Sequence, residues 1–69
     1  MESQGMMIAR TLMAELSTRE ECIAQVKKYI DNLNNQFDAM GYTADDLKNM
    51  KAHKEALSIL QSNTPISPL

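Results

Sequence analysis

Few residues in this sequence could carry out chemistry, and the single cysteine and the single histidine stand out. A cysteine nucleophile needs a nearby base or positive charge that lowers the pKa of its thiol. Cys22 instead follows Glu20 and Glu21, whose charges raise that pKa, so we interpret it as an inert, partly buried residue. His53 alone cannot form a multi-histidine metal site, and no cysteine or carboxylate cluster lies at ligand spacing around it. We therefore predict a packed or rim histidine and no metal site.

Two pairs of adjacent acids, Glu20-Glu21 and Asp45-Asp46, are the remaining candidates for acid–base catalysis. Each pair falls in the first turn of a predicted helix, where negative charge offsets the helix dipole. The sequence has no glycine-rich phosphate loop and no nucleophile elbow. A monomer of 69 residues is also too small to enclose a pocket of several hundred Å³. We therefore predict no enzymatic activity and no cofactor.

The overall charge argues against a nucleic-acid-binding protein. Seven basic and nine acidic residues give a formal net charge of -2, so no global field attracts a polyanion. Asp and Glu residues interleave with the lysines, and ion pairs at i+3 and i+4 are expected to neutralise most of them. The alternative function is a small homodimeric regulator of the phage or plasmid type, which would contact nucleic acid through Lys27, Lys28, Lys48, Lys51 and Lys54.

The elements that must position these residues are predicted to be helices. A heptad pattern of apolar residues, which is typical of a coiled-coil seam, comprises Ile23, Val26, Ile30, Leu33, Phe37 and Met40. The same register continues back to Ala9, with Arg19 as the only interruption. We therefore expect one long helix over about residues 7–40. The alternative is a break near Ser17 into three helices, because Ser17 and Glu20 match a capping box.

The residues around Gly41 predict the end of one helix and the start of the next. Gly41 suits the left-handed position after a helix, Tyr42 can contact the preceding helix, and Thr43 can cap the next one. The following helix is expected over about residues 44–62, and its main apolar stripe comprises Leu47, Met50, Leu57 and Leu60. A second, narrower apolar edge comprises Ala52, Ala56 and Ile59. The predicted fold is an all-α antiparallel hairpin in one domain over residues 1–69, with flexible ends at 1–5 and 63–69.

The two predicted helices differ in length, so part of the first would remain uncovered. At 1.5 Å per residue the first is roughly 50 Å long and the second roughly 28 Å. The uncovered stretch either folds back as a third helix or docks on another chain, and its methionines favour docking because their flexible thioethers adapt to irregular surfaces. The predicted partner-binding residues are Met6, Ile8, Leu12, Met13 and Leu16. The partner is expected to be another protein or a second copy of this chain.

The same sequence predicts a cytoplasmic location. No run approaches the roughly 18 apolar residues that span a bilayer, so no membrane insertion is expected. The lone Cys22 cannot form an internal disulfide, which favours a reducing compartment.

The layout of a small acidic chain, with one long heptad helix, a glycine-containing turn and a shorter helix, resembles a bacterial protein family. It is similar to the co-chaperones that hold the needle subunit of type III secretion systems, and Leu16-Ser17-Thr18-Arg19-Glu20-Glu21 is the local stretch that carries the likeness. The resemblance implies a cytoplasmic hairpin that pairs with a larger helical-repeat chaperone and keeps an aggregation-prone needle protein monomeric. We therefore predict a non-enzymatic protein–protein interaction module, most specifically a co-chaperone or adaptor that shields an apolar surface of its partner.

Overall fold

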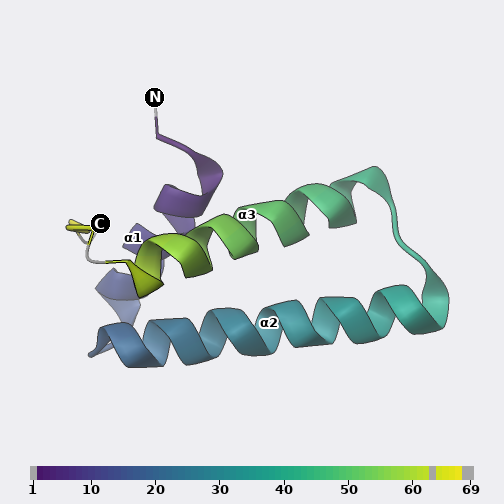
Figure 1. Cartoon of the computed structure of the whole chain (residues 1–69), viewed down its shortest axis with the longest axis horizontal. Coiled ribbons are helices and arrows are strands. Elements are labelled where there is room, and N and C mark those ends of the chain that lie inside the picture. Colours follow the sequence, from purple (N-terminus) through teal and green to yellow (C-terminus); the bar gives the residue numbers. More distant parts are fainter. Residues whose placement is uncertain (1, 63, 68–69) are drawn as a thin grey trace.

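The computed structural model describes residues 2–62 and 64–67, and within them the regular secondary structure is entirely helical. The helices are α1 (Gln4–Glu15), α2 (Arg19–Met40) and α3 (Ala44–Gln61). α2 and α3 form an antiparallel hairpin, and α1 crosses it on one side (Figure 1). α1 packs mainly on α3 and only slightly on α2. The predicted all-α class is confirmed, and no helix in the described residues has the length and apolar character needed to cross a membrane.

The expectation of one continuous helix over residues 7–40 is wrong, and the alternative break near Ser17 is confirmed. Leu16 ends α1 in an extended backbone conformation, with φ −110° and ψ 153°. The N-cap of α2 is Thr18, whose hydroxyl accepts a hydrogen bond of 3.1 Å from the Glu21 amide. The cap therefore lies one residue after the predicted Ser17 cap. The heptad pattern failed here because α1 folds back to bury its apolar face within the same chain.

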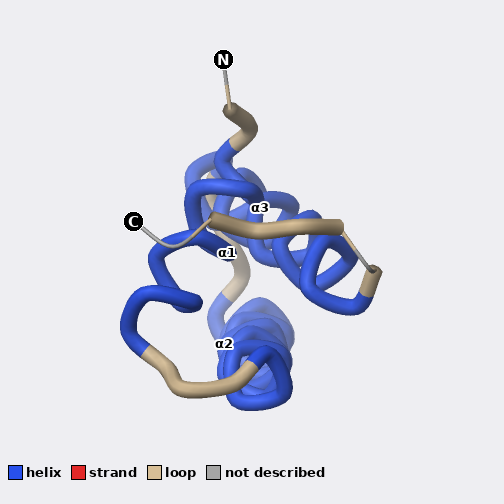
Figure 2. The backbone as a smooth tube through the Cα atoms, turned by 90° about the vertical axis from the view of Figure 1, so that its left-hand side faces the viewer, coloured by secondary structure: helices blue, strands red, loops and turns tan. Residues whose placement is uncertain are grey.

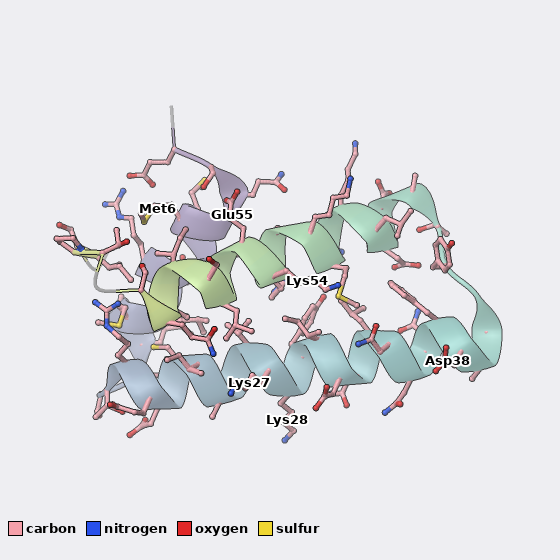
Figure 3. The ribbon with its side chains drawn as sticks, in the orientation of Figure 1. Met6, Lys27, Lys28, Asp38, Lys54 and Glu55 are labelled. Atoms are coloured by element: carbon pink, nitrogen blue, oxygen red, sulfur yellow. The ribbon has the colours of Figure 1, made fainter. Side chains whose placement is uncertain are left out.

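Small residues let α1 approach α3 closely. Gly5 and Ala9 are buried on α1, and Ala52 and Ala56 are buried on α3. The Gly5 amide donates a hydrogen bond of 3.0 Å to the carboxylate of Glu55, which thereby satisfies one of the free amides at the start of α1. Figure 3 shows Glu55 on the side of α3 that faces the beginning of α1. The second apolar edge predicted for α3 is therefore the surface that α1 covers.

Residues near both ends of the described chain make contacts, where the sequence predicted flexible segments. α1 begins at Gln4, within the expected flexible stretch 1–5, and the Ser3 hydroxyl caps it by accepting from the Met6 amide. After α3, Ile66 packs against the hydrophobic core. The remaining expectations of flexibility concern residues 1, 63, 68 and 69, which lie outside the described residues.

The turn between α2 and α3 lies at Gly41 as predicted, although Gly41 is itself the C-cap of α2 and its ψ of −168° differs from the expected left-handed helical conformation. Gly41 has φ 80°, and its amide donates to the carbonyl of Phe37 at 3.0 Å. The Tyr42 ring packs on Phe37 with centroids 4.9 Å apart. Thr43 and Asp46 form a capping box at the start of α3. These local signals fix the antiparallel direction of the hairpin.

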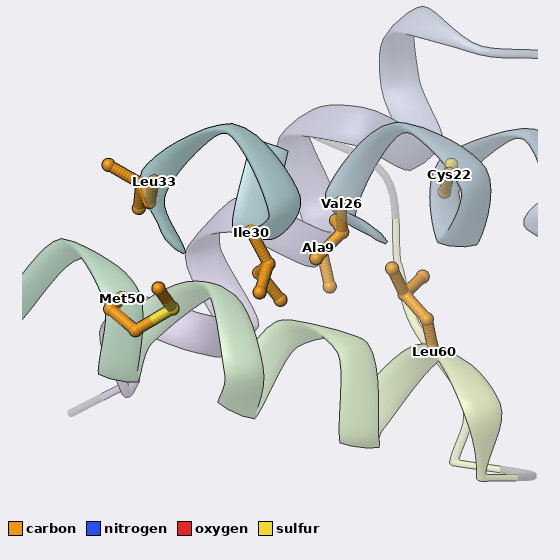
Figure 4. Close-up of a cluster of buried hydrophobic side chains, with 7 residues drawn as sticks. All are labelled: Ala9, Cys22, Val26, Ile30, Leu33, Met50 and Leu60. Atoms are coloured by element: carbon orange, nitrogen blue, oxygen red, sulfur yellow. The ribbon is translucent and has the colours of Figure 1, made fainter. Parts of the chain in front are cut away.

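The hydrophobic core receives side chains from all of the helices (Figure 4). Its buried members are Ala9, Cys22, Val26, Ile30, Leu33, Met50 and Leu60. Ile23, Phe37 and Leu57 pack against this cluster and are partly buried. Met40 and Leu47, which the sequence pattern assigned to the interior, are exposed instead. The core therefore ends before the turn, and the turn end of the hairpin has an uncovered apolar surface.

Candidate interaction surface

Cys22 is part of the core and has no exposed surface. Its thiol donates a hydrogen bond to the Met13 sulfur at 3.7 Å. Burial, and secondarily the negative charge of Glu21, raise the pKa of the Cys22 thiol. A buried thiol with a raised pKa stays protonated at neutral pH, which agrees with the interpretation of Cys22 as a packing residue.

His53 occupies the rim of the α2–α3 contact. Its imidazole stacks on Tyr29 with ring centroids 4.0 Å apart and an interplanar angle of 20°. Its Nδ1 lies 2.7 Å from the carbonyl oxygen of Asn49, one turn earlier in α3. Across residues 2–62 and 64–67, no group of histidine, cysteine and acidic side chains is placed to hold a metal ion. The ring of His53 is thus engaged in packing and in a backbone hydrogen bond.

The acid pairs lie where the sequence predicted, in first helical turns. Glu20 and Glu21 are in the first turn of α2, and Asp45 and Asp46 are in that of α3. The Asp46 carboxylate accepts from the Thr43 amide at 2.9 Å. Asp46 therefore caps α3, and the other three carboxylates are placed to offset the helix dipoles.

The predicted partner-binding residues of α1 are largely used inside the molecule. Leu12, Met13 and Leu16 pack against the core, and Met6 and Ile8 are half-buried. The expected overhang therefore does not exist, because α1 lies on α3 instead of extending α2. Docking of these residues on a partner stays a prediction, restricted to the atoms that α1 leaves exposed.

One apolar surface remains on the outer side of α1. Met7 is 53% exposed, and the predicted set omitted it. Together with Ile8, Thr11 and Leu12 it lines a shallow depression of about 230 Å³. Helical spacing was part of the available signal, because Met7 and Thr11 fall on the side of α1 opposite the buried Gly5 and Ala9, whereas Ile8 lies between this side and α3. We call this surface the α1 outer face.

A second apolar surface lies at the turn end of the hairpin. It comprises Met40, Tyr42 and Leu47, which are 80%, 59% and 41% exposed. We call these residues the turn-end patch. The heptad pattern missed it because the pattern records spacing along one helix and not where the partner helix begins.

The lysines are exposed but are not gathered into one strip. Lys28 extends from the side of α2 that points away from α3, whereas Lys54 is on α3 (Figure 3). A depression near the start of α1 is lined by Lys48 and Lys51 together with Glu55. The ion pairs expected for these lysines are not observed, since the ion pair found among the described residues joins Arg10 to Glu2. Because Lys28 points away from α3, it does not share one face with the lysines of that helix, which disfavours the nucleic-acid alternative.

Two arginines hold the segment that follows α3, an arrangement that sequence reasoning missed. Arg19 donates through Nη1 to the carbonyls of Leu60 and Ser62, each at 3.1 Å, and through Nη2 to that of Thr64 at 3.2 Å. Arg10 donates through Nε to the carbonyl of Ser67 at 2.9 Å. The signal was present, because Arg19 is the one residue that interrupts the heptad pattern. It caps the end of α3 instead of filling the seam.

Within the described residues, the candidate sites are thus the α1 outer face, the turn-end patch and the pair Arg10 and Arg19, which we call the arginine site. No family model, curated protein or solved structure matches this chain.

Proposed function

We propose that this protein is a non-enzymatic interaction module that binds another protein through the α1 outer face. The observation that carries the proposal is the exposure of Met7 beside Ile8 and Leu12 in an apolar depression. A methionine-containing apolar surface adapts to an irregular partner, and contiguous exposed apolar area is typical of interaction sites. Because α1 rests on α3, this surface is held on a folded support and needs no partner to form.

We further propose that the partner belongs to a type III secretion system and that this chain acts in the cytoplasm as a needle-subunit co-chaperone. The support is the resemblance of the hairpin formed by α2, the glycine-containing turn and α3, and of the stretch Leu16–Glu21, to that family; the single long helix of the expected layout is divided into α1 and α2. The proposed role is to pair with a larger helical-repeat chaperone and, together with it, to keep the needle subunit monomeric by covering apolar surface.

The test is co-expression with the needle subunit and the helical-repeat chaperone of the same organism. The expected result is a soluble complex of the three chains, measured by size-exclusion chromatography with light scattering. Met7→Asp places a charge in the α1 outer face and should weaken the complex at least tenfold, since burial of an unpaired charge is costly. Asn34→Asp adds the same charge at an exposed site on α2 and is the matched control. A complex that fails to form, or equal effects of the two variants, would contradict the proposal.

A further inference from the structure

The segment Thr64–Ser67 lies across the surface of the molecule and is held at a few points. Figure 2 shows it crossing from the end of α3 to the side of α1. Thr64, Pro65 and Ser67 are exposed, and Ile66 is partly buried against the core. Contacts of this kind resemble those of a bound peptide more than those of a core element, because most of the segment faces solvent.

The Thr64 amide and hydroxyl form hydrogen bonds with the neighbouring Ser62 hydroxyl, whereas the arginines of α1 and α2 recognise the segment through its carbonyl groups. A guanidinium has donors and no acceptor, so Arg19 and Arg10 can read only the oxygens of Thr64 and Ser67. Proline keeps its carbonyl but lacks an amide hydrogen, and its fixed φ favours an extended chain. The arginine site therefore suits an extended, proline-containing peptide with an aliphatic side chain between the two recognised carbonyls.

The segment leaves part of this site unfilled. A depression of about 440 Å³ lies between Met6 and Arg10 on α1 and Pro65 and Ser67 on the segment. Met6 is also one of the residues that the sequence predicted to bind a partner. The chain's own segment therefore covers one flank of the α1 surface for which docking was expected, and leaves room for a larger occupant.

We propose that Arg10, Arg19 and Met6 form a binding site for an extended, proline-containing segment of a partner protein, and that Thr64–Ser67 occupies this site intramolecularly until the partner's segment displaces it. The inference rests on the proposed function in that it names the kind of segment a protein partner presents. A tethered segment has an effective concentration in the millimolar range, so it blocks weak ligands and yields to a partner with additional contacts.

The test uses the full chain and a fluorescent, terminally blocked peptide with the sequence of residues 62–67. Ile66→Asp in the chain should release the internal segment, so that the peptide binds this variant at least tenfold more tightly than the wild-type chain, measured by anisotropy. Ser58→Asp adds the same charge at an exposed site on α3 and should bind like the wild type. A peptide carrying aspartate in place of its isoleucine should not bind. Equal affinity for the Ile66→Asp and wild-type chains, or no binding to the variant at about 1 mM peptide, would overturn the proposal.

A second measurement covers the case in which the Ile66→Asp variant does not fold. In the ¹⁵N-labelled wild-type chain, about 5 mM peptide exceeds the effective concentration of the tethered segment and should compete with it. The backbone amide resonance of Ile66 reports this competition, because a displaced Ile66 leaves the core that it packs against while the unlabelled peptide takes its place. We expect it to shift, and an unchanged resonance would refute the site. Neither measurement involves secretion proteins. A negative result for the peptide site is therefore distinguishable from failure of the three-chain complex to form.

Discussion

At Gly5, α1 lies too close to α3 to leave room for a side chain. A Cβ atom added there would lie 2.7 Å from the Cβ of Glu55 and 2.6 Å from its Cγ, both closer than real contacts allow. Alanine favours a helix over glycine by about 1 kcal/mol, whereas overpacking costs about 1–3 kcal/mol. Because neither Glu55 atom is the free end of its side chain, we expect Gly5→Ala to destabilise the fold by about 1 kcal/mol or more.

Urea unfolding at 25 °C measures this effect. A Gly5→Ala variant more stable than the wild type would mean that helix propensity dominates and that α1 does not sit closely on α3. In a Glu55→Ala background the same substitution should cost less, because Cγ and the carboxylate are then gone.

Arg19 gives opposite predictions from the sequence pattern and from the structure. By the heptad pattern, Arg19→Leu completes the seam and should stabilise the protein. In the structure the guanidinium donates to the carbonyls of Leu60, Ser62 and Thr64 and places a positive charge at the C-terminal end of α3. We therefore expect Arg19→Leu to destabilise the fold by about 1–3 kcal/mol, with Arg19→Lys intermediate. Chemical denaturation of the two variants distinguishes these predictions. An increase in the denaturation midpoint for Arg19→Leu would support the heptad interpretation.

Cys22 provides a prediction on pH. Burial raises the pKa of its thiol above the ordinary value of 9.0, so the unfolded chain releases the thiol proton at lower pH than the folded chain does. The stability from the protonated, buried thiol is full below that ordinary pKa and is lost as the pH rises from there through the raised pKa of the folded state. We expect the free energy of unfolding to fall more between pH 7.5 and 10 in the wild type than in Cys22→Ala. Urea titrations at both pH values test this, and parallel profiles would show that the thiol does not contribute.

At the scale of whole elements, the hairpin was predictable because its signals are local. Gly41, Thr43 and Asp46 lie within six residues of one another and specify a helix end and a helix start without any distant contact. The position of α1 was not predictable in this way. Leu12 and Leu16 keep the heptad register of α2, and the choice between extending and folding back depends on the fit of Gly5 and Ala9 against α3. That fit joins residues some fifty positions apart, as the Gly5–Glu55 hydrogen bond shows.

The candidate site was predictable to a smaller degree than the fold. The apolar character of the first helix indicated an interaction surface, but only the folded arrangement separates the exposed Met7 from the buried Ala9. Arg19 marked an irregularity in the heptad pattern, but what it binds was not predictable, because the arginine site recognises backbone carbonyls, which every residue carries.

Ala56 tests whether α1 is a separable element. It is fully buried on α3, and Ala56→Leu adds three carbon atoms where the two helices approach closely. We expect α1 to undock while α2 and α3 keep their contact, so amide hydrogens of α1 should exchange about 10–100-fold faster than in the wild type. Ala24→Leu on the exposed side of α2 is the matched control and should leave exchange unchanged. Equal loss of protection in all helices would show that the chain unfolds only as one unit.

At the scale of the whole molecule, the folded-back α1 removes the reason for obligatory self-association. All three helices contribute to one core, and among the described residues the α1 outer face and the turn-end patch are separate exposed apolar surfaces. We therefore expect a monomer whose melting temperature does not change over a roughly fiftyfold range of protein concentration, because only coupled association makes it concentration-dependent. Circular dichroism melts combined with sedimentation equilibrium measure both quantities. If the melting temperature rises with concentration, Met40→Asp locates the cause, since Met40 is 80% exposed in the turn-end patch. Loss of the rise in that variant would show that copies associate through this patch and would contradict the expected monomer.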